Sequence, residues 1–299
     1  MLDAFRGNQA LKESLQAALR AGRLSHSVLL CGEAGCGSGF AARCLAADYL
    51  YPEGDPQANA VLEGRAAECI EVRGEGASGE IRIDAVRQVR RKVFETALSA
   101  NGRVVIFYGA QKMNASSANA LLKVLEEPPE GVLFVLTATS AAAVLPTIRS
   151  RCAIYPIAPV TRQECVEWLQ EHCPDCKDPE LLAAVYDGHI GRAAAAAREP
   201  QAVQSFETAC QLAQAVAKGD RYRLMQLLAG YEKDKPAAAR LLANLASVAA
   251  AELAGAGRFG MSAHQAARTA SQCGEALQNM NRNLNQKLLL TLLAARIAR

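Results

Sequence analysis

A glycine-containing segment near the N-terminus has a residue spacing that could bind phosphate. Its sequence, GEAGCGSG, occupies residues 32–39. In a working phosphate loop, G-x-x-x-x-G-K-[ST], backbone N–H groups hold the phosphates, the lysine neutralises their charge and the hydroxyl binds Mg²⁺. Here Gly32 and Gly37 have the right spacing, but Ser38 stands in the lysine position and Gly39 in the Ser/Thr position. The segment predicts either a weak anion-binding loop or a tight turn that keeps the shape of a lost site.

A hydrolytic ATP site needs a second element, and the sequence lacks it as well. In phosphate-loop ATPases a buried strand ends in acidic residues that organise Mg²⁺ and the attacking water. The apolar strand expected at 104–107 is followed by Tyr108, Gly109, Ala110 and Gln111, none of which carries a carboxylate. Because two independent parts of the machinery are missing, we expect that this chain does not hydrolyse ATP by itself.

A third segment, Arg149-Ser150-Arg151-Cys152, places two guanidinium groups at the end of a loop. A guanidinium group is planar and can bind two phosphate oxygens through paired hydrogen bonds. Either arginine could therefore contact a phosphate. The alternatives are a surface arginine and an ion pair within the chain, and the residues alone leave these readings open.

The segments around these residues alternate between strand and helix patterns. Short apolar runs at 27–31, 104–108 and 131–136 are typical of strands buried on both faces, and residues 68–72 fit an edge strand. Helical patterns occupy residues 9–21, the stretch from the glycine segment to 49, the stretch from Asp84 (as N-cap) to 98, and the stretch from Asn114 (as N-cap) to the prolines at 128–129. The alternation predicts an α/β phosphate-loop fold with a parallel sheet covered on both faces.

From Pro159 onward the sequence predicts helices alone. Thr161 is a candidate N-cap, Pro179 opens another helix, and an alanine-rich helix begins near Gly191. A break near Pro200 leads into a region that is helical to the end of the sequence. We therefore expect three domains: an α/β domain over 1–158, a small helical domain over 159–199 and an all-helical domain over 200–299.

Composition narrows the class of protein. Hydrophobic residues make up 51% and aromatic residues 5% of the 299 residues, which favours helices over a β-sandwich. The net charge of +3 is too small to imply nucleic acid binding by itself. Ten cysteines are scattered through apparent core elements, which indicates a reduced, cytoplasmic setting. We expect no membrane-spanning segment, because no window of about 18 apolar residues occurs.

Several segments together resemble the clamp-loader branch of the AAA+ proteins. They are GRLSHSVLLCGEAGCGSG, IRIDAVRQVRRKV, NALLKVLEEPPEGVLFVLTATS and VLPTIRSRC, and the last of these with LLKVLEEPP forms the most specific part. Within that branch the chain resembles, over nearly its whole length, the delta-prime type of subunit of bacterial DNA polymerase III. NRNLNQKLLLTLL is similar to the last helix of the family's collar. The missing lysine and acids fit this non-hydrolysing type and count against the gamma/tau type.

The resemblance implies a role in DNA replication. The chain would join gamma/tau-type motor subunits and a delta subunit in a hetero-oligomer that loads the sliding clamp on primer–template DNA. The small helical domain would be the family's lid and the last domain its collar. No cofactor of its own is implied, since ATP would be held by a neighbouring subunit. Two alternatives stay open: an active gamma/tau-like ATPase with a nonstandard loop, and an AAA+-shaped adaptor without an ATPase partner.

The resemblance also suggests roles for individual residues. Arg151, within Ser150-Arg151-Cys152, would be an arginine finger that reaches the γ-phosphate of ATP in the neighbouring subunit. Arg192 resembles the sensor-2 arginine and Thr139 the polar sensor-1 position. His26 lies in a segment that the family places near the base, although we expect a structural role for it here. The degenerate phosphate loop comprises Gly32, Gly35, Gly37, Ser38 and Gly39.

Two further sets of residues have weaker implications. The family commonly carries a four-cysteine zinc module, but residues 51–68 contain no cysteine, so we expect the module to be absent. Cys173 and Cys176, with Cys165 and His172 nearby, form only half of a structural zinc site, and we expect a reduced, metal-free loop. The helix after Asp84 carries basic residues that could follow DNA phosphates or form a solvated face, namely Arg87, Arg90, Arg91 and Lys92.

Overall fold

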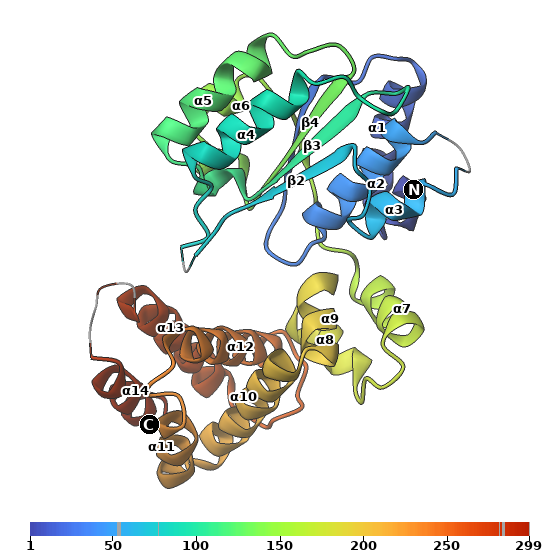
Figure 1. Ribbon diagram of the computed structural model, residues 1–299. Helices are drawn as coiled ribbons and strands as arrows, with labels where there is room; N and C mark the ends of the chain where they lie inside the picture. Colours follow the sequence, from blue (N-terminus) through green and yellow to red (C-terminus); the bar gives the residue numbers. More distant parts are fainter. Residues whose placement is uncertain (53–54, 77, 281, 283–284, 299) are drawn as a thin grey trace. The chain divides into compact units, whose positions relative to one another are not determined.

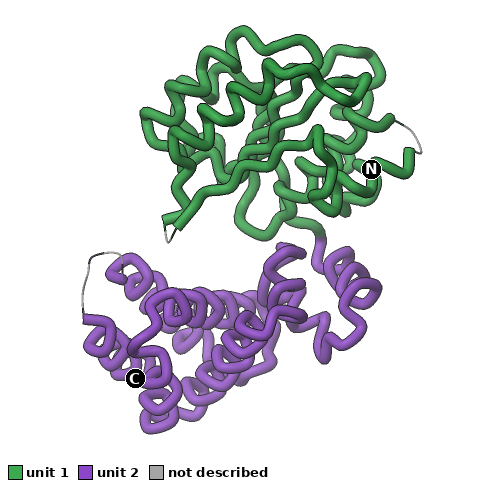
Figure 2. The backbone as a smooth tube through the Cα atoms, viewed as in Figure 1, with its two compact units in different colours: residues 1–160 green, residues 161–299 purple. Residues whose placement is uncertain are grey.

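The chain divides into two compact units, residues 1–160 and 161–299 (Figure 2). The computed structural model describes residues 1–52, 55–76, 78–280, 282 and 285–298. The expected boundary at residue 158 lies two residues before this division. The second expected boundary, near Pro200, stays a prediction, because the helices on either side of it pack together within the second unit.

The first unit is built on a parallel five-stranded sheet, as the alternation of patterns predicted (Figure 1). The order across the sheet is β2-β3-β4-β1-β5. Its strands are β1 (Ser27–Cys31), β2 (Cys69–Arg73), β3 (Arg103–Tyr108), β4 (Val132–Ala138) and β5 (Ala153–Pro156). In register, Leu29 of β1 lies opposite Leu136 of β4 on one side and opposite Ile154 of β5 on the other. The glycine segment thus leaves the sheet from an interior strand.

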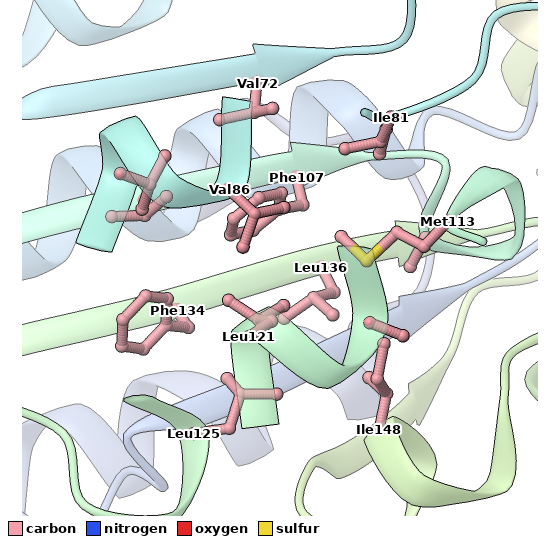
Figure 3. Packing of buried hydrophobic residues seen from close by; sticks show 14 of the residues in the cluster. Val72, Ile81, Val86, Phe107, Met113, Leu121, Leu125, Phe134, Leu136 and Ile148 are labelled. Carbon is pink, nitrogen blue, oxygen red and sulfur yellow. The ribbon is translucent and has the colours of Figure 1, made fainter. Parts of the chain in front are cut away.

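Helices cover both faces of this sheet (Figure 1). One face is covered by α1 (Gln9–Arg20), α2 (Ser38–Leu50) and α3 (Ala58–Leu62), and the other by α4 (Ile83–Val93), α5 (Ala115–Glu126) and α6 (Pro146–Arg149). Successive residues of a strand point to opposite faces, so Ile106 packs towards α2 while Phe107 packs towards α5. Both faces are apolar, which explains why the strands have continuous apolar sequences. Figure 3 shows the core between the sheet and helices α4, α5 and α6, which includes Phe107, Phe134 and Leu121.

Helix α4 differs from its prediction at both ends. Asp84 lies inside the first turn and the N-cap residue is Arg82, so the expected cap was wrong. The helix also ends at Val93 instead of continuing to residue 98. The buried Arg103 accounts for this end, because its guanidinium donates to the carbonyl oxygens of Lys92 and Glu95. Those carbonyls would otherwise accept from the next helical turn.

A buried ion pair between Glu68 and Arg103 fixes the segment that connects α4 to β3. Arg103 Nε donates to Glu68 Oε2 at 2.6 Å, and the exposed fractions of the two side chains are 9% and 5%. Glu68 Oε1 accepts a second bond, from the Leu98 backbone N–H at 2.6 Å. Burial alone would raise the pKa of Glu68, but its bonds with Arg103 and Leu98 hold it below the usual value. The carboxylate is therefore ionised and ties the segment after α4 to the start of β3.

Strand β5 follows the basic segment directly and was not predicted. It has four residues and ends in Pro156, at the edge of the sheet beside β1. A proline is tolerated there because an edge strand has no further neighbour to which it must donate. The short length gave no periodic signal. By pairing with β1, β5 anchors the chain just after Arg151.

The second unit is entirely helical in its described residues. Thr161 forms a capping box with Glu164 at the start of α7, as its position predicted. Helix α12 packs against α10 and α13, and α14 packs against α11 and α13. The helices are α7 (Arg162–His172), α8 (Pro179–Val185), α9 (Ile190–Arg198), α10 (Pro200–Lys218), α11 (Arg221–Ala229), α12 (Lys235–Leu253), α13 (Ala263–Met280) and α14 (Gln286–Ile297).

Across the described parts of both units, the helices are too short or too polar to cross a lipid bilayer.

The ion pair between Glu68 and Arg103 generates a stability prediction. Replacing Glu68 with alanine leaves a buried guanidinium without its carboxylate, so we expect a loss of about 3–5 kcal/mol in the free energy of unfolding. The control is Arg87→Ala, because Arg87 and Asp84 form an exposed pair and such a pair contributes about 0–1 kcal/mol. Urea denaturation of both variants makes the comparison. Equal losses would contradict the structural role of Glu68.

Candidate nucleotide site and arginine segment

The glycine segment forms the predicted turn between β1 and α2. Gly35 and Gly37 adopt left-handed backbone conformations, with φ of 96° and 92°, and Gly37 is the N-cap residue of α2. Only glycine adopts such values without strain. The backbone therefore keeps the strand–loop–helix shape that holds phosphate in a working site.

Protein atoms pack closely against this loop. A Cβ at Gly37 would lie 2.9 Å from Cε2 of Phe5, whose ring is buried. A Cβ at Gly32 would lie 2.4 Å from Cys36 Sγ and 2.6 Å from the Ile157 carbonyl oxygen. Burial raises the pKa of the Cys36 thiol and outweighs the backbone N–H of Ser38, which favours the thiolate. Neutral groups of the same chain thus pack against Gly32 and Gly37, and Ser38 stands where a working loop has its lysine.

The most informative contact joins Gly39 to Tyr108. A Cβ at Gly39 would lie 3.2 Å from Cε1 of the Tyr108 ring. Gly39 stands where a working loop has the Mg²⁺-binding hydroxyl, and Tyr108 stands where the strand would supply its carboxylate. Both metal-binding groups are absent, and an aromatic ring packs directly against the residue that should carry one of them.

The Tyr108 ring is held on two sides. The guanidinium carbon of Arg73 lies 3.7 Å from the ring centroid, a cation–π contact. Arg43 Nε donates to the Tyr108 hydroxyl at 3.1 Å and to Glu71 Oε1 at 2.6 Å, while Arg43 Nη2 donates to Glu71 Oε2 at 3.0 Å. This two-pronged pair is the strongest arginine–carboxylate geometry. Tyr108 therefore cannot swing aside without breaking a network that joins α2, β2 and β3.

The Tyr108 phenol and the Glu71 carboxylate have pKa values shifted in opposite directions. Burial raises the pKa of its phenol to about 12, so the group is neutral at physiological pH. Burial would also raise the pKa of Glu71, but its hydrogen bonds with Arg43 hold it below the usual value. The Glu71 carboxylate is already paired with Arg43 and with Arg73, at 3.2 Å. The one carboxylate in the cluster is thus committed to arginines.

Arg151 lies at the end of α6 and forms an ion pair within the chain. Its Nε donates to Glu126 Oε1 at 2.8 Å, and its Nη2 donates to the same oxygen. Its Nη1 donates to the Thr147 carbonyl oxygen at 2.9 Å and to the Ser150 hydroxyl at 3.2 Å. The side chain is 33% exposed and Glu126 is 46% exposed. The structure therefore contains the ion pair that the sequence left open, in a position that solvent reaches.

The residues beside Arg151 have supporting roles. Ser150 accepts a hydrogen bond from Arg151 and donates one to the Thr147 carbonyl oxygen at 3.2 Å. Cys152 packs against the core under α5, and burial raises the pKa of its thiol to about 12. It is therefore a neutral packing group. Arg149 is half-buried, and among the described residues its side chain has no hydrogen bond or ion pair.

The two sensor-like residues, Arg192 and Thr139, lie in different units. Arg192 donates from Nη2 to the Ser247 hydroxyl at 2.9 Å, and its guanidinium carbon lies 4.9 Å from the centre of the Tyr186 ring. These contacts hold α9 to α12 within the second unit. Thr139 is exposed after β4, whereas its neighbour Thr137 is buried and accepts a hydrogen bond from the Gly109 N–H at 3.1 Å. The buried threonine is the one that contacts the segment after β3.

His26 has the structural contact that was expected for it. One ring nitrogen lies 3.0 Å from the carbonyl oxygen of Leu125. That bond links the start of β1 to the last turn of α5. It engages the imidazole away from the glycine segment, at the opposite end of β1.

The cysteines of the second unit have the properties of core thiols. Cys165 and Cys173 are buried, and burial raises the pKa of Cys165 to about 11. His172 stacks on Trp168 with ring centroids 4.5 Å apart, and its Nδ1 lies 3.0 Å from the Trp168 carbonyl oxygen. In the described part of the chain, no three His, Cys, Asp or Glu side chains are grouped so that they could hold a metal ion. All ten cysteines are free thiols.

The basic residues of α4 mostly face solvent. Arg87, Arg91 and Lys92 are exposed and Arg90 is half-buried. Arg87 Nη1 lies 3.5 Å from Asp84 Oδ1, which offsets part of the charge. The helix therefore offers an exposed basic face, and its role in DNA binding stays a prediction.

Sequence reasoning missed the groups that hold Tyr108 and Arg151. Glu71 and Arg73 are two residues apart on β2 and so share one face of the strand, which is a signal that could have been used. Arg43 lies one helical turn after Gly39 on α2. Glu126 gave no such signal, because its contact with Arg151 joins segments 25 residues apart.

The chain is similar in sequence to subunits of DNA polymerase III. The family model described as DNA polymerase III, delta subunit, matches residues 7–161. The delta-prime subunit of DNA polymerase III from Escherichia coli is 32% identical over 225 residues, which are 72% of this chain and 67% of that protein. The gamma/tau subunit from Mycobacterium bovis is 35% identical over 158 residues, which are 50% of this chain but only 27% of that protein.

A solved structure has the same fold along most of the chain. It is a DNA polymerase III gamma subunit-related protein from Thermotoga maritima, with a TM-score of 0.61 and 21% sequence identity. The match covers 95% of this chain and 98% of that one. At this identity the likeness concerns the fold.

The contact between Gly39 and Tyr108 can be tested by paired substitutions. Gly39→Thr alone adds a side chain against a held ring and should destabilise the protein by about 1–3 kcal/mol. Tyr108→Ala alone leaves a cavity and should also destabilise it. The double variant should lose about 1 kcal/mol less stability than the sum of the two single losses. The reason is that the threonine side chain can occupy the cavity left by the tyrosine ring. Denaturation of the three variants measures this coupling, and simple additivity would show that the two sites are independent.

Proposed function

The chain belongs to the delta-prime-like clamp-loader subunits of DNA polymerase III, and from this premise we propose that it is a pseudo-ATPase that serves the ATP site of a neighbouring subunit. Its relatives are delta-prime and gamma/tau subunits. It would join gamma/tau-type motor subunits and a delta subunit and help to load the sliding clamp on primer–template DNA. Its own phosphate loop would have a structural role in this assembly and would not hydrolyse ATP.

The observation that carries the proposal is the packing of Tyr108 against Gly39. A gamma/tau-like ATPase needs a lysine, a Mg²⁺-binding hydroxyl and an acidic residue at the end of the strand. Here Ser38 and Gly39 lack the first two, and a neutral Tyr108 replaces the third. Restoring one group would leave the other two absent, so a nonstandard active site is the weaker alternative.

The second part of the proposal concerns Arg151. An adaptor that never meets an ATPase would have no use for a solvent-accessible arginine that Thr147 and Ser150 hold just after the short helix α6. In our proposal this guanidinium reaches the γ-phosphate of ATP in the adjacent motor subunit. Arg192, held by Ser247 and Tyr186, would couple the lid to the collar instead of contacting nucleotide.

DNA and clamp contacts belong to the proposal as well. The exposed basic face of α4, with Arg87, Arg91 and Lys92, would follow DNA phosphates within the assembly. Because the net charge of the chain is small, this contribution would be local and shared with other subunits.

The pseudo-ATPase assignment predicts that the purified chain has no ATP turnover above background. The physical reason is that Ser38 and Gly39 replace the lysine and the Mg²⁺-binding hydroxyl of a working loop, and Tyr108 replaces the acidic residue. A steady-state phosphate-release assay, with a purified gamma/tau-type subunit as positive control, makes the measurement. Turnover that disappears in a Gly37→Val variant would refute the assignment, since that substitution blocks the loop.

The trans role of Arg151 predicts a loss of activity in the reconstituted complex. Arg151→Ala should remove about 10³–10⁵-fold of the rate at the one ATP site that it serves, which lowers the DNA-stimulated ATPase of the whole assembly. Arg151→Lys should lower it too, because lysine keeps the charge but not the paired hydrogen bonds. The control is Arg162→Ala, since Arg162 also forms an exposed ion pair, with Asp187, but on α7. Wild-type activity with Arg151→Ala would exclude the finger.

A further inference from the structure

The arginine segment and the end of α5 meet in an arrangement that the proposed function does not explain. The Arg151 guanidinium has five N–H donors. Hydrogen bonds from Nε, Nη1 and Nη2 go to the Thr147 carbonyl oxygen, the Ser150 hydroxyl and, twice, to Glu126 Oε1. These four bonds leave one N–H, on Nη2, without a partner among the described residues.

The two sides of the guanidinium are held differently. Its Nη1 is bound by the segment just before it, through Thr147 of α6 and Ser150, the C-cap residue of α6. The edge formed by Nε and Nη2 is bound by Glu126, which comes from a different element, α5. That edge is one of the two through which arginine can grip two oxygens of a phosphate, and the other includes Nη1, whose N–H groups are already bound to Thr147 and Ser150. A phosphate can therefore be gripped in this way only if Glu126 leaves.

Glu126 is able to leave. Both acceptor contacts use the single oxygen Oε1, so the pair lacks the fork geometry in which each oxygen receives its own N–H. The carboxylate is 46% exposed and water can solvate it after release. By contrast, the bonds of Nη1 stay with α6 and keep the guanidinium on the surface.

We propose that Glu126 competes with the neighbouring subunit's γ-phosphate for the Nε–Nη2 edge of Arg151. Before the phosphate arrives, Glu126 holds the side chain in one rotamer and neutralises its charge. When the phosphate engages, Glu126 is displaced, and its negative charge then lies close to the phosphate. This inference rests on the trans role of Arg151 proposed above. Glu126 is a positioning residue in it and touches no reacting atom.

The proposal predicts a gain of affinity when the charge of Glu126 is removed. In the reconstituted clamp loader, Glu126→Gln should lower the dissociation constant for ATPγS about fivefold or more, since one like charge near the phosphate is lost. The complex has several ATP sites, and the site to follow is the one whose affinity for ATPγS is lowered by Arg151→Ala. The turnover number should change far less than the dissociation constant, because glutamine makes no new contact in the transition state.

The neighbouring residue provides a matched control. Glu127 is also exposed, carries the same charge and, in the described structure, makes no side-chain contact with Arg151. Glu127→Gln should leave ATPγS affinity unchanged. An equal gain in both variants would mean a general effect of net charge and would overturn the proposal. Thermal unfolding of both variants checks that each folds, which is expected for exposed side chains.

The double variant Glu126→Gln/Arg151→Ala separates this inference from the proposed function. If Glu126 acts through Arg151, the double variant should bind ATPγS like Arg151→Ala alone. A loss of turnover without gain of affinity in Glu126→Gln would overturn the competition while leaving the finger in place. If Arg151→Ala itself has no effect on ATPase or binding, the proposed function fails, and the inference with it.

Discussion

The structure depends on burying a parallel sheet on both faces. The interiors of strands β1, β3 and β4 are apolar, and the polar groups considered for a phosphate site lie at the carboxyl ends of the strands and in the loops that follow. The glycine segment follows β1 and Tyr108 ends β3 at that edge. The side chains at these carboxyl ends determine whether the domain can bind and hydrolyse a nucleotide.

At this edge, the positions of a metal site are filled by packing interactions. Gly39 provides the space, Tyr108 fills it, and Arg43, Arg73 and Glu71 hold the ring in place. The Glu71 carboxylate, which could have attracted a cation, is neutralised by two arginines. The backbone of the loop survives because Gly35 and Gly37 still form the turn that joins β1 to α2. The backbone architecture of a phosphate loop is thus present without the side chains that a working loop carries.

The same architecture presents Arg151 to the outside. The short helix α6 and the edge strand β5 fix the chain on both sides of this residue. The guanidinium is bound on one side by Thr147 of α6 and on the other by Glu126 of α5. These contacts give the arginine a defined position, and its side chain stays 33% exposed.

The sequence by itself determined the α/β fold, the caps at Asn114 and Thr161 and the missing lysine and acids, because each follows from local residue type and spacing. It misplaced the end of α4, since the buried Arg103 that binds the carbonyl oxygens of Lys92 and Glu95 lies ten residues beyond Val93. Only the tertiary structure decided that Tyr108 packs on Gly39 and that Glu126 binds Arg151. Both contacts join residues far apart in the chain, and a local pattern holds no information on which distant side chains the sheet and its helices bring together.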